Sequence, residues 1–67
     1  MTMQLTINSQ PRDTTATTLA ELLDELQLET RHVAVELNQT IVERTRFAET
    51  RLHENDRLEL IQFVGGG

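Results

Sequence analysis

Apolar and polar residues alternate along three segments of the chain, which is the pattern of a strand with one buried face. The segments are residues 3–7, residues 33–37 and residues 57–64. In the last of them, Leu58 and Leu60 alternate with charged neighbours, and the residues that follow add branched and aromatic bulk suited to a pleated surface. We therefore predict three strands that turn their apolar side chains toward a common core.

Two shorter strands are predicted mainly from the turns that precede them. Residues 8–11, Asn-Ser-Gln-Pro, are a turn signal, and a strand at residues 12–15 would complete a hairpin with the first strand. Asn38 and Gln39 form a second turn, which is followed by a short strand at residues 40–43.

A single amphipathic helix is predicted at residues 19–27. Thr18 and Glu21 have the spacing of a capping box, in which the hydroxyl and the carboxylate each accept a hydrogen bond from the other residue's amide. Four leucines then follow at i, i+3, i+4 and i+7, which places them on one face of a helix. They are Leu19, Leu22, Leu23 and Leu26.

The element order is strand, strand, helix, strand, strand, strand, which indicates an α+β fold with a mixed five-stranded sheet. Parallel strands need a crossover connection, so we expect the first and last strands to pair in the middle of the sheet. The helix would pack on one face, an arrangement called the ubiquitin-like β-grasp. Residues 44–52 resemble an irregular surface segment pinned by Phe47 and Leu52. The domain is expected to cover residues 1–64, which leaves residues 65–67 as a flexible glycine tail.

Composition excludes several classes of function. A chain of 67 residues buries only about 60% of its unfolded surface, which leaves little room for an enclosed active site. It has no cysteine and a net charge of −5, so a thiolate metal site is excluded and no nucleic-acid partner is expected. Because it lacks an apolar run of about 18 residues and a signal-peptide pattern, we expect a cytoplasmic protein without membrane contact.

Conventional catalytic and metal-ligating groups are also not apparent. His32 and His53 lack the spacing of metal ligands, and no serine or threonine has a sequence-adjacent base to activate it. We therefore expect no bound metal or cofactor, and a protein that is not itself an enzyme.

The candidate chemistry lies at the C-terminal end, where Gly65, Gly66 and Gly67 follow the last predicted strand directly. Glycine packs no side chain, so we expect a thin, mobile arm with a free carboxylate that no Cβ atom shields. A partner enzyme could activate this carboxylate with ATP to give an acyl-adenylate and pyrophosphate. A sulfur nucleophile would then displace AMP and leave a thiocarboxylate at Gly67. The alternative at this point is a frayed chain end without a role.

A second candidate site is the face of the last strand that points away from the helix. Because Leu58 and Leu60 face the helix, the intervening residues point outward, and the same rule applies to the third strand. If the two strands are neighbours, they form an apolar centre with a charged rim, as partner interfaces do. We call this set the docking surface: Ala34, Glu36, Arg57, Glu59, Ile61, Phe63 and Val64. The alternative is that Phe63 folds back onto the edge of the core.

These features together resemble the ThiS family, the sulfur carriers of thiamin thiazole biosynthesis. The resemblance covers nearly the whole chain: the compact size, the hairpin start, the capped leucine helix, residues 35–42 and the ending at residues 56–67. Gly66 and Gly67 match the family ending, whereas many relatives have another residue at the position of Gly65.

The resemblance implies a cycle of partners around Gly67. A ThiF-type, E1-like enzyme would adenylate its carboxylate with ATP, a persulfide donor would supply sulfur, and a ThiG-type thiazole synthase would consume the thiocarboxylate. Two other functions remain open at this point. One is a sulfur carrier for another pathway, of the molybdopterin or cysteine type, and the other is a β-grasp interaction module with an inert tail.

Overall fold

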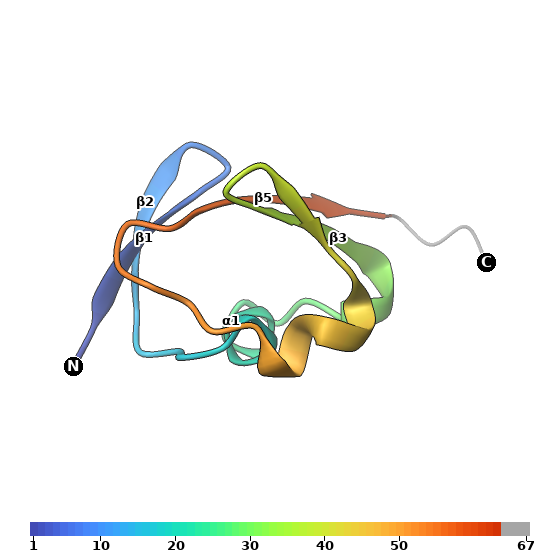
Figure 1. Cartoon of the computed structure of the whole chain (residues 1–67), viewed down its shortest axis with the longest axis horizontal. Helices are drawn as coiled ribbons and strands as arrows, with labels where there is room; N and C mark the ends of the chain where they lie inside the picture. The colour runs from blue at the N-terminus through green and yellow to red at the C-terminus, as the bar shows by residue number, and fades with distance from the viewer. Residues whose placement is uncertain (64–67) are drawn as a thin grey trace.

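The computed structural model describes residues 1–63, so predictions about residues 64–67 lie outside the described residues. The described chain forms five strands, one α-helix and two 3₁₀ helices (Figure 1). In chain order they are β1 (Met3–Ile7), β2 (Gln10–Thr14), α1 (Leu19–Glu25), η1 (Thr30–His32), β3 (Val33–Leu37), β4 (Thr40–Val42), η2 (Arg44–Glu49) and β5 (Arg57–Gln62).

The strands form one mixed sheet in the order β2-β1-β5-β3-β4. β1 and β5 are parallel neighbours in the middle, whereas β1 with β2, β3 with β4 and β3 with β5 are antiparallel. α1 lies on one side of the sheet and leaves the other face open (Figure 1). The predicted β-grasp fold, with the first and last strands paired at its centre, is confirmed.

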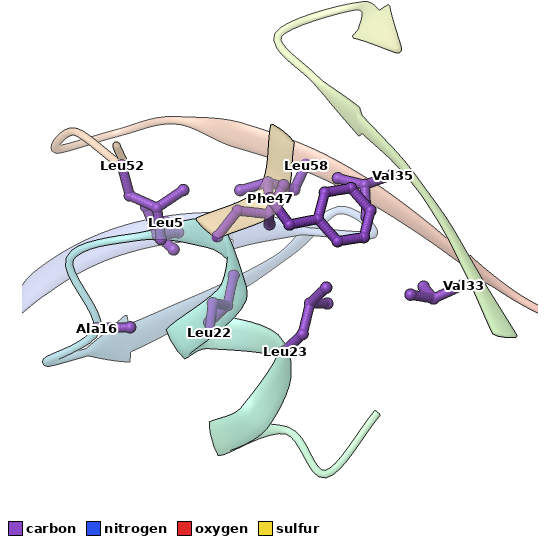
Figure 2. Close-up of a cluster of buried hydrophobic side chains, with 10 residues drawn as sticks. Leu5, Ala16, Leu22, Leu23, Val33, Val35, Phe47, Leu52 and Leu58 are labelled. Carbon is purple, nitrogen blue, oxygen red and sulfur yellow. The ribbon is translucent and has the colours of Figure 1, made fainter. Parts of the chain in front are cut away.

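The core lies between α1 and the sheet (Figure 2). Leu22 and Leu23 of α1 are completely buried, as is Leu5 of β1, and Leu58 of β5 is 1% exposed. Leu26, the fourth leucine of the predicted stripe, is only partly buried. Within residues 1–63, the buried apolar residues are Leu5, Ala16, Leu19, Leu22, Leu23, Val33, Val35, Phe47, Leu52 and Leu58.

Both hairpin turns contain two residues with left-handed backbone geometry. Asn8 and Ser9 have φ angles of 50° and 69°, and Asn38 and Gln39 have 50° and 70°. Positive φ at both central residues is the turn geometry that matches the twist of paired strands, and asparagine tolerates it well. The first turn is therefore shorter than predicted: β2 begins at Gln10 rather than residue 12. Its proline is tolerated because β2 is an edge strand.

The start of α1 is as predicted, but its end is not. Thr18 Oγ1 accepts a hydrogen bond from the Glu21 amide at 3.2 Å, and Glu21 Oε1 accepts one from the Thr18 amide at 3.3 Å, which completes the capping box. The helix ends at Glu25 rather than at residue 27. Gln27 has φ 59°, and the Leu28 amide donates to the Leu23 carbonyl at 2.9 Å, so a left-handed cap closes the helix.

Three further boundaries differ from the predictions. Residues 44–49 form the 3₁₀ helix η2 rather than an irregular segment, although Phe47 and Leu52 pin this region to the core as expected. β4 ends at Val42 rather than at residue 43. β5 ends at Gln62, so Phe63, which the prediction included in the last strand, lies outside it. None of the helices within residues 1–63 is long and apolar enough to cross a membrane.

A polar contact joins α1 to β2 beside the core. Glu25 Oε2 accepts from Arg12 Nη2 at 2.9 Å, and Glu25 Oε1 accepts from the hydroxyl of the buried Thr14 at 2.6 Å. The hydrogen bond from Thr14, followed by those from Arg12, lowers the pKa of the Glu25 carboxyl below its ordinary value of 4.5. The charged form of Glu25 is therefore the form that stabilises the folded chain.

We predict different costs for two leucine truncations on α1. Leu22→Ala should lower the free energy of unfolding by about 2–5 kcal/mol, because it removes a fully buried side chain. Leu26→Ala should cost clearly less, since Leu26 is only partly buried. Urea melts of both variants measure the difference, and equal losses would contradict the described burial.

We also predict that the stabilising effect of Glu25 depends on pH. A carboxyl whose pKa is lower in the folded state contributes stability above its unfolded pKa and loses it as pH falls through the folded pKa. Glu25→Gln should therefore be less stable than wild type at neutral pH, and the two should converge as pH falls below 4.5. Urea midpoints of both proteins across this range are the measurement, and a constant difference would count against the contact.

Candidate functional site

The site is built on β5, the central strand, which leads directly into the residues at the C-terminal end. Its hydrogen bonds alternate between two neighbours. The Asn38 amide donates to the Arg57 carbonyl and the Phe63 amide donates to the His32 carbonyl, both at 2.7 Å. The backbone N–H and C=O groups of odd-numbered β5 residues therefore point toward β3. On the other side, the Asn8 amide donates to the Leu58 carbonyl at 2.9 Å, so the backbone groups of even-numbered residues point toward β1.

The side chain of Asn8 extends the parallel pairing after β1 has ended. Its Oδ1 accepts from the Leu60 amide at 2.8 Å, and its Nδ2 donates to the Leu60 carbonyl at 3.2 Å. A carboxamide has one acceptor and one donor in the spacing of a peptide group. Asn8 therefore takes the place of another strand residue beside β5.

Asn38 has the corresponding role at the other end of β5. Its Oδ1 accepts from the Arg57 amide at 3.0 Å, and its Nδ2 donates to Asp56 Oδ1 at 3.0 Å. Asp56 is 9% exposed, and its other oxygen accepts from the His53 amide at 2.7 Å. The two turn asparagines thus bond to the β5 backbone at Arg57 and at Leu60.

Sequence reasoning identified both asparagines as turn residues only. The turn role has a signal in the sequence, because each asparagine follows a predicted strand and opens a turn with positive φ. The hydrogen bonds from their side chains to β5 depend on β5 lying beside β1 and β3, which the sheet order shows.

The docking surface is brought together on the open face, as far as the structure describes it. Ala34 is paired with Ile61, and Glu36 with Glu59, across β3 and β5. Ile61 is 60% exposed and Phe63 is 53% exposed, so neither side chain is buried in the core. Phe63 also lines a hollow at the sheet edge with Val33 and Phe47. Val64 lies outside the described residues, as do Gly65, Gly66 and Gly67.

Two carboxylates lie opposite each other beside this apolar centre. Glu36 and Glu59 are direct cross-strand partners, an arrangement of like charges that is unfavourable in a sheet. Neither forms an ion pair with any of residues 1–63. They line a shallow groove together with Asn38, Gln39 and Arg57. The rim is thus predominantly acidic and would suit a basic group on a partner.

Ile41 is an exposed apolar residue that the predicted surface did not include. It is 75% exposed and is paired with Glu36, so it lies on the same open face. The sequence contained the signal. A two-residue turn at residues 38–39 pairs Ile41 with the outward-facing Glu36 and Val42 with the buried Val35, so Ile41 must point outward.

The described residues contain no arrangement that points to catalysis by the domain itself. No group of three or more His, Asp or Glu side chains within residues 1–63 could hold a metal ion. His53 is exposed and His32 is half-buried. Within residues 1–63, the structure shows an exposed surface on the open face and a strand, β5, that is hydrogen-bonded to neighbours on both sides.

Comparison with protein families gives a match to the model described as the ThiS family over residues 5–67. The match includes the sheet, the helix and the C-terminal glycines. The chain belongs to the ThiS family. The resemblance predicted from the sequence is confirmed.

Relatives of this ThiS-family chain include a sulfur carrier protein and thiazole synthases. A sulfur carrier protein ThiS from Bacillus subtilis is 42% identical over 50 residues, which cover 75% of this chain and 76% of that protein. A thiazole synthase from Paramagnetospirillum magneticum is 41% identical over 66 residues, or 97% of this chain. The chain spans only 20% of the length of that thiazole synthase.

The fold also matches a solved structure of the family. The crystal structure of a thiamine biosynthesis protein (ThiS) from Geobacter metallireducens superimposes with a TM-score of 0.81 at 35% identity. The match covers 97% of this chain and 100% of that one.

We predict that the open face tolerates a charge that the core side of the same strand does not. Ile61→Asp should change the free energy of unfolding by less than about 1 kcal/mol, because Ile61 is exposed. Leu58→Asp, the matched control in β5, should cost about 4 kcal/mol or more, because it buries a carboxylate. Urea melts measure both, and an unfolded Ile61→Asp protein would place Ile61 in the core.

Proposed function

We propose that this chain is a sulfur carrier protein of thiamin biosynthesis and that the C-terminal carboxylate of Gly67 is its reactive group. The observation that carries the proposal is the match to the ThiS family over residues 5–67, which includes the glycine ending. The arrangement of β5 supports it, because the central strand of the sheet leads straight to this ending. We expect the cycle to take place in the cytoplasm.

The proposed reaction sequence activates the carboxylate and then exchanges its oxygen for sulfur. A carboxylate oxygen of Gly67 attacks the α-phosphorus of ATP, and pyrophosphate leaves. The terminal sulfur of a persulfide donor attacks the acyl carbon, and AMP leaves. A second thiol then attacks the donor's sulfur in this acyl disulfide, forms a new disulfide with the donor, and releases the thiocarboxylate. ATP and the catalytic groups belong to a ThiF-type adenylating enzyme, so this chain acts as its substrate and binds no cofactor.

The acceptor in this proposal is a ThiG-type thiazole synthase. The supporting observation is that sequences 41% and 38% identical to this chain over 66 residues occur within proteins named thiazole synthase. In two organisms, a protein named thiazole synthase thus contains a segment similar to this chain. This arrangement fits a carrier that delivers sulfur to a thiazole synthase.

The docking surface would position Gly67 in the adenylating enzyme. Ile61 and Phe63 are exposed beside the end of β5, and the four residues 64–67 reach at most about 14 Å from there. An enzyme that acts on Gly67 must therefore lie close to this face. The apolar centre with its acidic rim is the surface that we assign to that contact.

ATP–pyrophosphate exchange with a ThiF-type enzyme tests the proposal. Wild-type protein should support exchange, whereas deletion of Gly67 should abolish it and leave the melting curve unchanged. Ile61→Asp should raise the KM at least about tenfold, which corresponds to about 1.4 kcal/mol of binding. Wild-type exchange by the Gly67 deletion would refute the role of the carboxylate, and an unaltered KM for folded Ile61→Asp would place the docking surface elsewhere.

A further inference from the structure

Pairing on the β1 side of β5 stops before the strand ends. β1 is paired only with Arg57 and Leu58 of β5, and the Asn8 side chain occupies the next position, at Leu60. The hydrogen-bond alternation directs the N–H and C=O of Gln62 to this same side, because the Phe63 amide faces β3. Within residues 1–63, no strand is paired with Gln62 on that side. β5 also runs on past the β1–β2 hairpin (Figure 1).

The other edges of the sheet carry features that discourage pairing with a further strand, but this one does not. β2, at one edge, contains Pro11 and the charged Arg12 and Asp13. β4, at the other edge, has only 3 residues. Proline, charge and short length are the usual protections of an exposed edge. By contrast, residues 60–63 are Leu-Ile-Gln-Phe, with no charge and no proline.

We propose that this edge of β5, at Gln62, pairs with an extended segment of the adenylating enzyme that receives the C-terminal residues. The Gln62 amide would donate to a carbonyl of that segment, and the Gln62 carbonyl would accept from one of its amides. Addition of a strand to an open sheet edge is a general mode of peptide recognition, in which backbone hydrogen bonds supply affinity. The inference rests on the proposed function.

We assign the partner strand at this edge to the adenylating enzyme because Gln62 is close in sequence to Gly67, the residue on which that enzyme acts in the proposed function. Gln62 is five residues before Gly67, so the surface around the nucleotide must lie close to the end of β5. The docking surface adjoins the edge, since Ile61 and Phe63 flank Gln62 and are exposed. An enzyme that covered Ile61 and Phe63 would also remove water from the Gln62 backbone. It would therefore have to supply hydrogen bonds in return.

A matched pair of substitutions separates the backbone of Gln62 from its side chain. Gln62→Pro removes the amide hydrogen, whereas Gln62→Ala keeps it and removes only the side chain. Because the amide faces away from β3, both variants should fold with melting temperatures close to that of wild type. In ATP–pyrophosphate exchange, Gln62→Pro should lose about tenfold in kcat/KM, equal to one hydrogen bond's worth of binding. Gln62→Ala should stay close to wild type.

Amide hydrogen exchange of the wild-type protein gives a second readout that needs no variant. In the free protein the Gln62 amide should exchange quickly and the Phe63 amide slowly, since the Phe63 amide is bonded to His32. In the complex with the adenylating enzyme, the Gln62 amide should also become protected.

Several results would overturn the inference. A folded Gln62→Pro protein with wild-type kcat/KM, or a Gln62 amide that stays unprotected in the complex, would remove the edge contact and leave the carrier function intact. Protection of Gln62 in the free protein that grows with concentration would assign the edge to a second copy of the chain. Wild-type protein without any exchange activity would refute the proposed function itself, and the inference with it.

Discussion

Hydrogen bonding along both sides of β5 is the constraint on which the rest of the domain depends. β1 and β5 are parallel neighbours, and parallel strands can be joined only through a crossover, which α1 and the elements around it supply. The same crossover places α1 over Leu58, the most deeply buried residue of β5. In so small a chain the sheet centre and the core centre therefore coincide.

Two asparagine side chains add hydrogen bonds to β5 without lengthening the neighbouring strands. β1 is paired with β5 only at Arg57 and Leu58, and the side chain of Asn8 bonds to the β5 backbone at Leu60. On the side of β3, the Asn38 side chain adds a hydrogen bond from the Arg57 amide at the start of β5. Each asparagine also tolerates the positive φ of its hairpin turn. Each asparagine thus provides both a turn residue and side-chain hydrogen bonds to β5, which is bonded up to Leu60 on the side of β1 and up to Phe63 on the side of β3.

This organisation suits a protein whose reactive group belongs to a partner's chemistry. The exposed Ile61 and Phe63, at the end of the central strand, would give the proposed partner a defined surface. Opposed carboxylates at Glu36 and Glu59 add an acidic rim that is unfavourable until a basic group meets it. In the proposed function, the domain offers Gly67 to a partner enzyme that supplies the active site.

Features that depend on local chemistry were predictable from the sequence. The capping box of Thr18 and Glu21, the strand alternation at Leu58 and the turn at Asn38 each follow from neighbouring residues, and each is confirmed. Their order was enough for the sheet topology, because parallel pairing permits few connections.

Features that depend on contacts between distant residues were not predictable in the same way. Gln27 ends α1 through a left-handed backbone that glycine usually adopts, so no residue signal marked the end. Asp56 is a polar turn residue that is buried because Asn38 and the His53 amide, which the fold brings to it, satisfy its oxygens. The position of the docking surface, by contrast, followed from the alternation of side chains along β3 and β5.

Intact-mass spectrometry tests the central claim most directly. The purified protein is incubated with ATP, a ThiF-type adenylating enzyme and a persulfide donor, and its mass is compared with that of a control without ATP. The account predicts a gain equal to the difference between one sulfur and one oxygen atom, located by fragmentation at Gly67 and absent from the Gly67 deletion. An unchanged mass in the presence of an adenylating enzyme that is active on another carrier would contradict it.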